Sequence, residues 1–142
     1  MNEKIVVRQE PLPAEWEGRR VGLLDALCYV RHQLSLGRGL WFTTGAETVE
    51  SLFVFTNGWA ANSQFNARFN AGQDEDWMDF LDWLRDIKHE LPEEGWHVKY
   101  LRDCQGDHEQ AARKFLDFVS EYVALNRAAP SRGARNGQNG PT

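Results

Sequence analysis

The sequence has few cysteines and no long apolar segment, and both absences restrict the class of protein. Only two of its 142 residues are cysteines, Cys28 and Cys104, which is too few for a disulfide framework and fits reduced thiols. No run approaches the ~20 apolar residues of a membrane-spanning helix. The first residues also lack the apolar core and cleavage site of a signal peptide. We therefore expect a cytoplasmic protein that does not bind membranes.

A basic excess and the common catalytic motifs are also missing. The formal net charge is −5, whereas a general nucleic-acid binder needs a basic face. The phosphate-binding motifs GxGxxG and GxxxxGK(S/T), the nucleophile motif GxSxG and the zinc motif HExxH are all absent. We expect no direct nucleic-acid binding, no enzymatic activity and no cofactor.

The chain is rich in aromatic residues and has the length of a single domain. Its six Trp, eight Phe and three Tyr can form a core or anchor a protein interface. We predict one globular domain over residues 1–127. Residues 128–142 (AAPSRGARNGQNGPT) are rich in Gly, Asn and Pro and have no apolar period, so we predict a disordered C-terminal tail.

Hydrophobic periodicity predicts three helices, over residues 20–36, 74–91 and 107–127. Short β-branched or alternating runs predict about five strands, over residues 4–8, 40–44, 52–55, 65–69 and 96–102. Asn57-Gly58 is a strong signal for a type I′ hairpin turn, and a short helix over residues 60–65 is the alternative to an early return strand.

The resulting order β-α-β-β-β-α-β-α predicts an α+β fold, with a mostly antiparallel sheet and helices packed on one face. Element orders of this kind occur in secretion chaperones and in several toxin-immunity proteins, although no shared motif accompanies the likeness.

The predicted helix over residues 74–91 separates into an apolar face and an acidic face. Its core-facing stripe holds Trp77, Phe80, Leu81, Leu84, Ile87 and Leu91. The opposite side carries a row that we call the acidic strip: Glu75, Asp79, Asp82, Asp86 and Glu90. Met78 and Trp83 border this strip, one on each side. Trp83 is therefore expected to be partly exposed.

The acidic excess of the protein is concentrated on this helix. Residues 74–94 contain nine acids and two bases, giving −7, while the rest of the chain contains twelve acids and fourteen bases, giving +2. Like charges at helical spacing destabilise a helix slightly. The strip is either a solvated face that aids solubility or a docking site for a basic partner, with an aromatic side chain as its anchor.

We predict a bacterial or mobile-element protein of the inhibitor or immunity type. It would bind a basic protein partner by mimicking nucleic acid with Glu75, Met78, Asp79, Asp82, Trp83, Asp86 and Glu90, together with Trp59 near the hairpin tip. It would be a monomer or a homodimer. A secretion-type chaperone or adaptor that uses its sheet face is an alternative.

Two Cys-x3-His pairs support a second alternative, a metal protein or a Cys/His enzyme. Cys28 precedes His32 by four residues, and Cys104 precedes His108 by four. This spacing is unusual for zinc, and 71 residues separate the two pairs, so we assign no metal site. His89 and His97, near several glutamates, are most simply polar surface.

Overall fold

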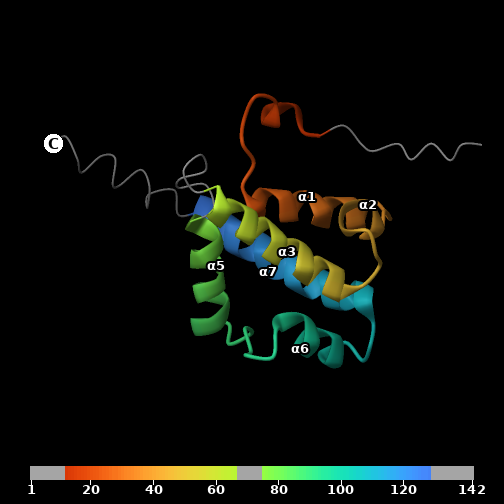
Figure 1. The fold of residues 1–142 in the computed structure, drawn as a ribbon. Coiled ribbons are helices and arrows are strands. Elements are labelled where there is room, and N and C mark those ends of the chain that lie inside the picture. The colour runs from red at the N-terminus through yellow and green to blue at the C-terminus, as the bar shows by residue number, and fades with distance from the viewer. Residues whose placement is uncertain (1–11, 67–74, 129–142) are drawn as a thin grey trace, which may run out of the picture.

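The computed structural model describes residues 12–66 and 75–128, and all regular elements in these two stretches are helical. A one-turn 3-10 helix, η1 (Ala14–Trp16), is followed by six α-helices (Figure 1). These are α1 (Leu23–Ser35), α2 (Trp41–Thr44), α3 (Val49–Phe65), α5 (Glu75–Asp86), α6 (Trp96–Asp103) and α7 (His108–Ala128). The prediction of an α+β fold is therefore wrong for the described chain, which is all-α.

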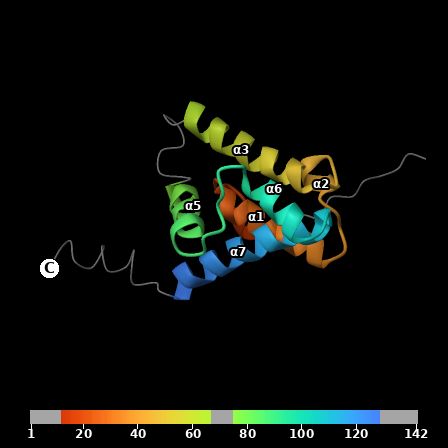
Figure 2. The same ribbon diagram turned by 90° about the horizontal axis from the view of Figure 1, so that it is seen from below.

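The last helix, α7, is the centre of the packing. It contacts α1, α3, α5 and α6. Figure 1 shows α1 and α6 on opposite sides of the molecule, and Figure 2 shows α3 and α7 on the other two sides. In both views α5 lies across the end of the bundle where α7 ends.

The predictions of helices over residues 20–36 and 107–127 are confirmed by α1 and α7. The predicted apolar stripe of α1 is buried throughout, and its residues are Leu23, Leu27, Val30 and Leu34.

The predicted strand over residues 40–44 is instead the one-turn helix α2. The side chain of Thr44 donates to the carbonyl of Leu40, and the carboxylate of Glu47 accepts the backbone N–H groups of Leu40 and Trp41 at 3.0 and 2.9 Å. Gly45, at φ 83°, then ends the turn in the left-handed conformation. These local hydrogen bonds outweigh the strand propensity of LWFTT.

The predicted hairpin around Asn57-Gly58 is instead the interior of α3. Thr48 caps this helix by accepting the N–H of Ser51 at 3.2 Å. Val49, Leu52 and Thr56 are buried at i, i+3 and i+7, so the apolar run over residues 52–55 follows a helical period. The alternative helix over residues 60–65 is present as the end of α3.

The predicted strand over residues 96–102 is the helix α6. Trp96 and Tyr100 are its buried residues, at i and i+4. The Trp96 ring stacks on Phe115 of α7 with centroids 3.7 Å apart and planes 4° apart. In a segment this short, the apolar residues fit the strand period of 2 and the helical period of 3.6 equally well. Packing of Trp96 against α7 stabilises the helical form.

Other predictions lie on residues outside the described part of the chain. These are the strand over residues 4–8, most of the strand over residues 65–69, and the tail, of which only Ala128 is described, as the last residue of α7. The chaperone alternative depended on an exposed sheet face, and residues 12–66 and 75–128 form no sheet.

Candidate functional site

The acidic helix α5 is attached to the bundle by its apolar face. Trp77, Phe80 and Leu84 are buried, as the sequence predicted. The Phe80 ring meets Phe115 and Tyr122 of α7 edge-on, with centroids 5.9 and 5.5 Å apart. This aromatic packing fixes the orientation of α5 and therefore the direction of its outer face.

The outer face of α5 presents acids to solvent. Asp79, Asp82 and Asp86 are exposed, and the bordering Met78 is 58% exposed. Glu75 is the first residue of α5, and its side chain lies outside the described part of the chain. The acidic strip thus exists over residues 79–86 as a row of carboxylates on one helix.

Arg85 partly neutralises this row. Its guanidinium binds Asp82 at 3.0 Å and Asp86 at 2.8 Å. The hydrogen bond from Arg85 lowers the pKa of Asp86, and the bond to Asp86 raises the pKa of Arg85. Asp79 has no ion pair with any described residue. With five acids and one base, α5 carries a formal charge of −4.

Glu90 does not belong to the strip. The helix ends at Asp86, five residues before the predicted end, and the chain then turns through His89 at φ 57°. Glu90 consequently points to the bundle, where its carboxylate lies 2.9 Å from the ammonium of Lys99 and 3.5 Å from that of Lys114. The same early helix end leaves Ile87, a predicted core residue, 65% exposed.

Trp83 is a packing residue more than an exposed anchor. Its ring lies against Phe118 and Tyr122, with centroids 6.4 and 5.3 Å away, and the Lys88 ammonium sits 5.4 Å from its centroid. Its side chain is half-buried. Met78 is therefore the large apolar side chain that α5 exposes beside its acids.

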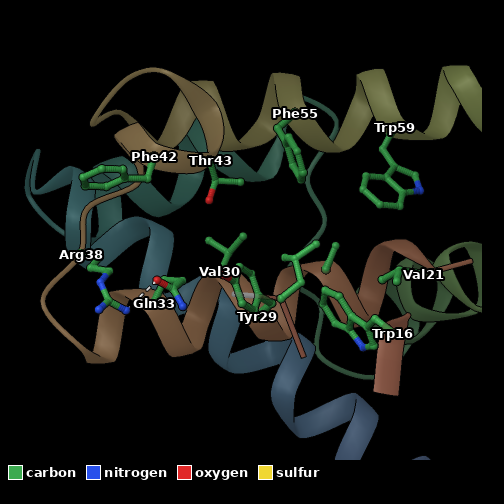
Figure 3. A pocket seen from close by; sticks show the side chains of 12 residues that line it. Trp16, Val21, Tyr29, Val30, Gln33, Arg38, Phe42, Thr43, Phe55 and Trp59 are labelled. Atoms are coloured by element: carbon green, nitrogen blue, oxygen red, sulfur yellow. Dashed lines mark hydrogen bonds between the residues drawn. The ribbon is translucent and has the colours of Figure 1, made fainter. Parts of the chain in front are cut away.

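A second candidate site is a pocket of about 370 Å³ between α1 and α3 (Figure 3). Phe55 and Trp59 of α3 form one wall, and Tyr29 and Val30 of α1 form the other, joined by Trp16 of η1. Most of the lining is aromatic or aliphatic. A pocket of this size, apolar with a few polar groups, is typical of small-molecule sites.

The polar groups of the pocket gather at the end near α2. Gln33, which is 8% exposed, accepts a hydrogen bond at 3.1 Å from the guanidinium of Arg38, and Thr43 lies nearby (Figure 3). Arg38 is the one charged side chain among the described residues that line the pocket. The pocket is therefore polar at one end, where Gln33 and Arg38 lie, and apolar at the other.

Trp59 lines this pocket from within α3, so the prediction that it lies at a hairpin tip is wrong. Its ring meets Phe55 edge-on with centroids 6.0 Å apart. The i, i+4 spacing of Phe55 and Trp59 is a helical signal that could have placed both residues on one wall. The pocket could not be predicted from the sequence because Phe55 and Trp59 were expected in a strand and a turn.

Of the residues in the two Cys-x3-His pairs, Cys28 and Cys104 pack against the core and His108 makes a hydrogen bond within the fold, whereas His32 is exposed. The Cys28 thiol is half-buried on α1, and burial, followed by the nearby Asp25, raises its pKa, which lowers its reactivity. The Nδ1 atom of His108 accepts the backbone N–H of Val49 at 3.2 Å. Across the described stretches, no three His, Cys, Asp or Glu side chains form a group that could hold a metal ion.

The imidazole ring of His97 packs against aromatic side chains of the helical bundle. It stacks on Phe53 with centroids 3.8 Å apart, and burial lowers its pKa. Its Nδ1 atom is buried without a hydrogen-bond partner. His89, the other histidine of the predicted polar surface, is exposed.

Comparison with family models, curated proteins and solved structures finds no match for this chain. None of the described helices has the length and apolar character needed to cross a membrane. The outer face of α5 and the pocket between α1 and α3 are therefore the features of the described chain from which a function can be proposed.

Proposed function

We propose that this protein is a non-catalytic binding module of the inhibitor or immunity type, which covers a basic surface of a protein partner with the outer face of α5. The observation that carries the proposal is the charge of −4 on a helix whose opposite face is locked into the core by Trp77, Phe80 and Leu84. A rigid row of like charges steers an oppositely charged partner and sets its register.

Acids elsewhere in the described chain support the proposal by contrast. Asp117 pairs with Arg31, Asp25 with Arg127, and Glu121 with Lys88, and each of these pairs joins separate parts of the fold. On α5, Asp82 and Asp86 share Arg85 of their own helix. The printed ion pairs of Asp82 and Asp86 are thus with their own helix only, and a cationic partner surface can take the place of Arg85 as their counter-charge.

Met78 supplies an apolar contact beside the carboxylates. A flexible thioether side chain adapts to an irregular partner surface and contributes affinity that the charges alone lack. A groove lined by Lys and Arg, as in proteins that bind nucleic acid, fits a row of carboxylates in the positions of phosphates. The partner class is therefore a basic protein.

Site-specific photocrosslinking tests this proposal in the native cells. The crosslinking amino acid p-benzoylphenylalanine replaces Met78 in one variant and Val54 of α3 in a matched control, because the two side chains are 58% and 59% exposed. We expect position 78 to crosslink to a protein of net positive charge and position 54 not to do so. Mass spectrometry identifies the product.

A second arm neutralises the acids in the position-78 crosslinking variant. The triple change Asp79→Asn, Asp82→Asn and Asp86→Asn should abolish the crosslink, whereas the control change Glu15→Gln, Glu17→Gln and Glu50→Gln removes the same charge from other exposed sites and should leave it intact. If the product persists after the acids of α5 are neutralised, or if both positions capture the same proteins, the outer face of α5 is only a solvated surface.

A further inference from the structure

The imidazole of His97 lies at the contact between α3 and α6. It stacks on Phe53 of α3 with ring centroids 3.8 Å apart, and Phe53 also meets Trp96 of α6 edge-on with centroids 5.6 Å apart. Phe53 therefore packs on α6 through two neighbouring rings. Since one of these rings is an imidazole, the contact between α3 and α6 depends on the position of a side chain that titrates near neutral pH.

The Nδ1 atom of His97 is enclosed by the fold. It is buried without a hydrogen-bond partner. The backbone at Gly95 lies so close that a Cβ atom added there would be 2.8 Å from Nδ1 and 2.7 Å from Cε1. A neutral imidazole can leave Nδ1 as the nitrogen without a proton. An imidazolium carries an N–H group on both nitrogens, so it places a donor at Nδ1, where the described fold offers no acceptor.

The charged groups around the ring favour protonation only in part. A groove of about 540 Å³ borders His97, and its other titratable lining residues are Glu50 of α3, Arg102 of α6 and His108 of α7. Arg102 is paired with Glu94 at 2.7 Å, and His108 uses its Nδ1 atom to accept a backbone N–H group. Burial lowers the pKa of His97, and the carboxylate of Glu50 opposes this effect. The neutral ring is therefore the form that fits the position on Phe53.

We propose that His97 makes the contact between α3 and α6 acid-sensitive, because protonation moves its imidazole off Phe53 into the groove beside Glu50 and loosens α6 from α3. The groove offers the charged ring water and a counter-charge. Helix α6 remains attached to α7 by the stack of Trp96 on Phe115, so the change is local. The proposal is independent of the proposed function of α5, since no described residue of α5 lines the groove.

The direction of the pH effect is set by the difference between closed and open α6. The pKa of His97 is lowered in the closed state, so an open state with the ring in water binds a proton more readily. The closed state is therefore fully favoured above the ordinary pKa of 6.5, and this advantage is lost as the pH falls below that value. The ratio of open to closed α6 rises by at most about tenfold for each pH unit between the two pKa values.

NMR titration of the full chain between about pH 7.5 and about pH 5 tests the proposal. We expect the ring protons of His97 to titrate at a lower pH in the folded protein than in the urea-unfolded chain. At neutral pH these protons should also show the upfield ring-current shift of a stack on Phe53, and protonation should remove it. The hydrogen-exchange protection of the α6 amides, corrected for the intrinsic effect of pH, should fall by up to about tenfold per pH unit, while the amides around Phe115 of α7 keep theirs.

Variants at two positions separate His97 from other titrating groups. His97→Phe keeps a ring beside Phe53 but cannot be protonated, so the protection of α6 should not change with pH. His32→Gln, at an exposed histidine of α1, should respond to acid as the unsubstituted protein does. Glu50→Gln removes the counter-charge and should lower the pH at which His97 titrates, whereas Glu15→Gln on η1 should leave that pH unchanged.

Any of three results would overturn the proposal. They are titration of His97 at or above the pH found in the unfolded chain, a ring-current shift that persists after protonation, and protection of α6 that either stays constant in acid or falls equally in His97→Phe. Substitution of Asp79, Asp82 and Asp86 by Asn should leave the His97 titration unchanged, so that failure of this inference is distinguishable from failure of the α5 proposal.

Discussion

The substitution Gly58→Ala distinguishes the helix α3 from the hairpin that Asn57-Gly58 would otherwise form. In the structure, Gly58 lies inside α3 without a positive φ, and an added Cβ atom has no heavy atom within 4 Å. Alanine is therefore free of strain and clash, and it reduces the entropy lost when the residue becomes helical. We expect the free energy of unfolding to rise by about 1 kcal/mol.

The matched control is Gly45→Ala, the same chemical change at the end of α2. Gly45 also has no heavy atom within 4 Å of an added Cβ, but its φ is 83°. Because L-residues other than Gly pay roughly 1–2 kcal/mol in this left-handed region, we expect the free energy of unfolding to fall by about that amount. The two variants should shift stability in opposite directions.

Urea unfolding followed by circular dichroism measures both effects, and each ~1 kcal/mol corresponds to a melting shift of roughly 4 °C for a domain of this size. In a type I′ turn, both central residues have positive φ, so Gly58→Ala would instead destabilise the protein as Gly45→Ala does. A loss of stability in Gly58→Ala would therefore refute the helical assignment of α3.

Two further predictions concern the bundle. Phe115→Ala removes a fully buried ring that stacks on Trp96, so the free energy of unfolding should fall by about 3–5 kcal/mol in urea titrations. Hydrogen bonds from Lys114 and then Lys99 hold the pKa of Asp103 at about 2, below its ordinary 3.8. Because this carboxyl binds protons more readily when unfolded, its contribution is complete above about pH 4 and is lost as the pH falls to about 2. Asp103→Asn should flatten the stability profile across that interval, and an unchanged acid slope would contradict the assignment.

The length of the regular apolar stripe, and not the length of the helix, decided which elements could be predicted from the sequence, since α3 has 17 residues and was assigned mostly to a strand and a turn. The stripes of α1 and α7 extend over several turns, and a period of 3.6 is unmistakable there. The runs that become α2, the start of α3 and α6 contain four to eight residues, and a segment so short fits a period of two almost as well. Their state is set by contacts that the pattern does not reveal, such as the Thr48 cap and the stack of Trp96 on Phe115.

The candidate sites were predictable to different degrees. A single helix with one long apolar face is enough to place Asp79, Asp82 and Asp86 together, and the structure does so. Glu90 was misplaced because α5 ends at Asp86, well before Pro92, the residue expected to stop it. The pocket draws its lining from η1, α1, α2 and α3, so it depends on the packing of α1 against the segments of α2 and α3, which had been assigned to strands and a turn.

Asp79 separates the demands of folding from those of binding. It is exposed, has no ion pair among the described residues, and lies three positions before the acid Asp82 on the same helix. Repulsion between such neighbours costs a helix about 0.2–0.5 kcal/mol, so Asp79→Asn should stabilise the protein slightly. Asp82→Asn, the control, also removes a bond to Arg85 at 3.0 Å and should gain less or nothing. Urea unfolding of both variants at low salt measures the difference, and a clear loss of stability in Asp79→Asn would show that this acid supports the fold. If the variant gains stability but loses its crosslink from position 78, partner binding accounts for a charge that folding disfavours.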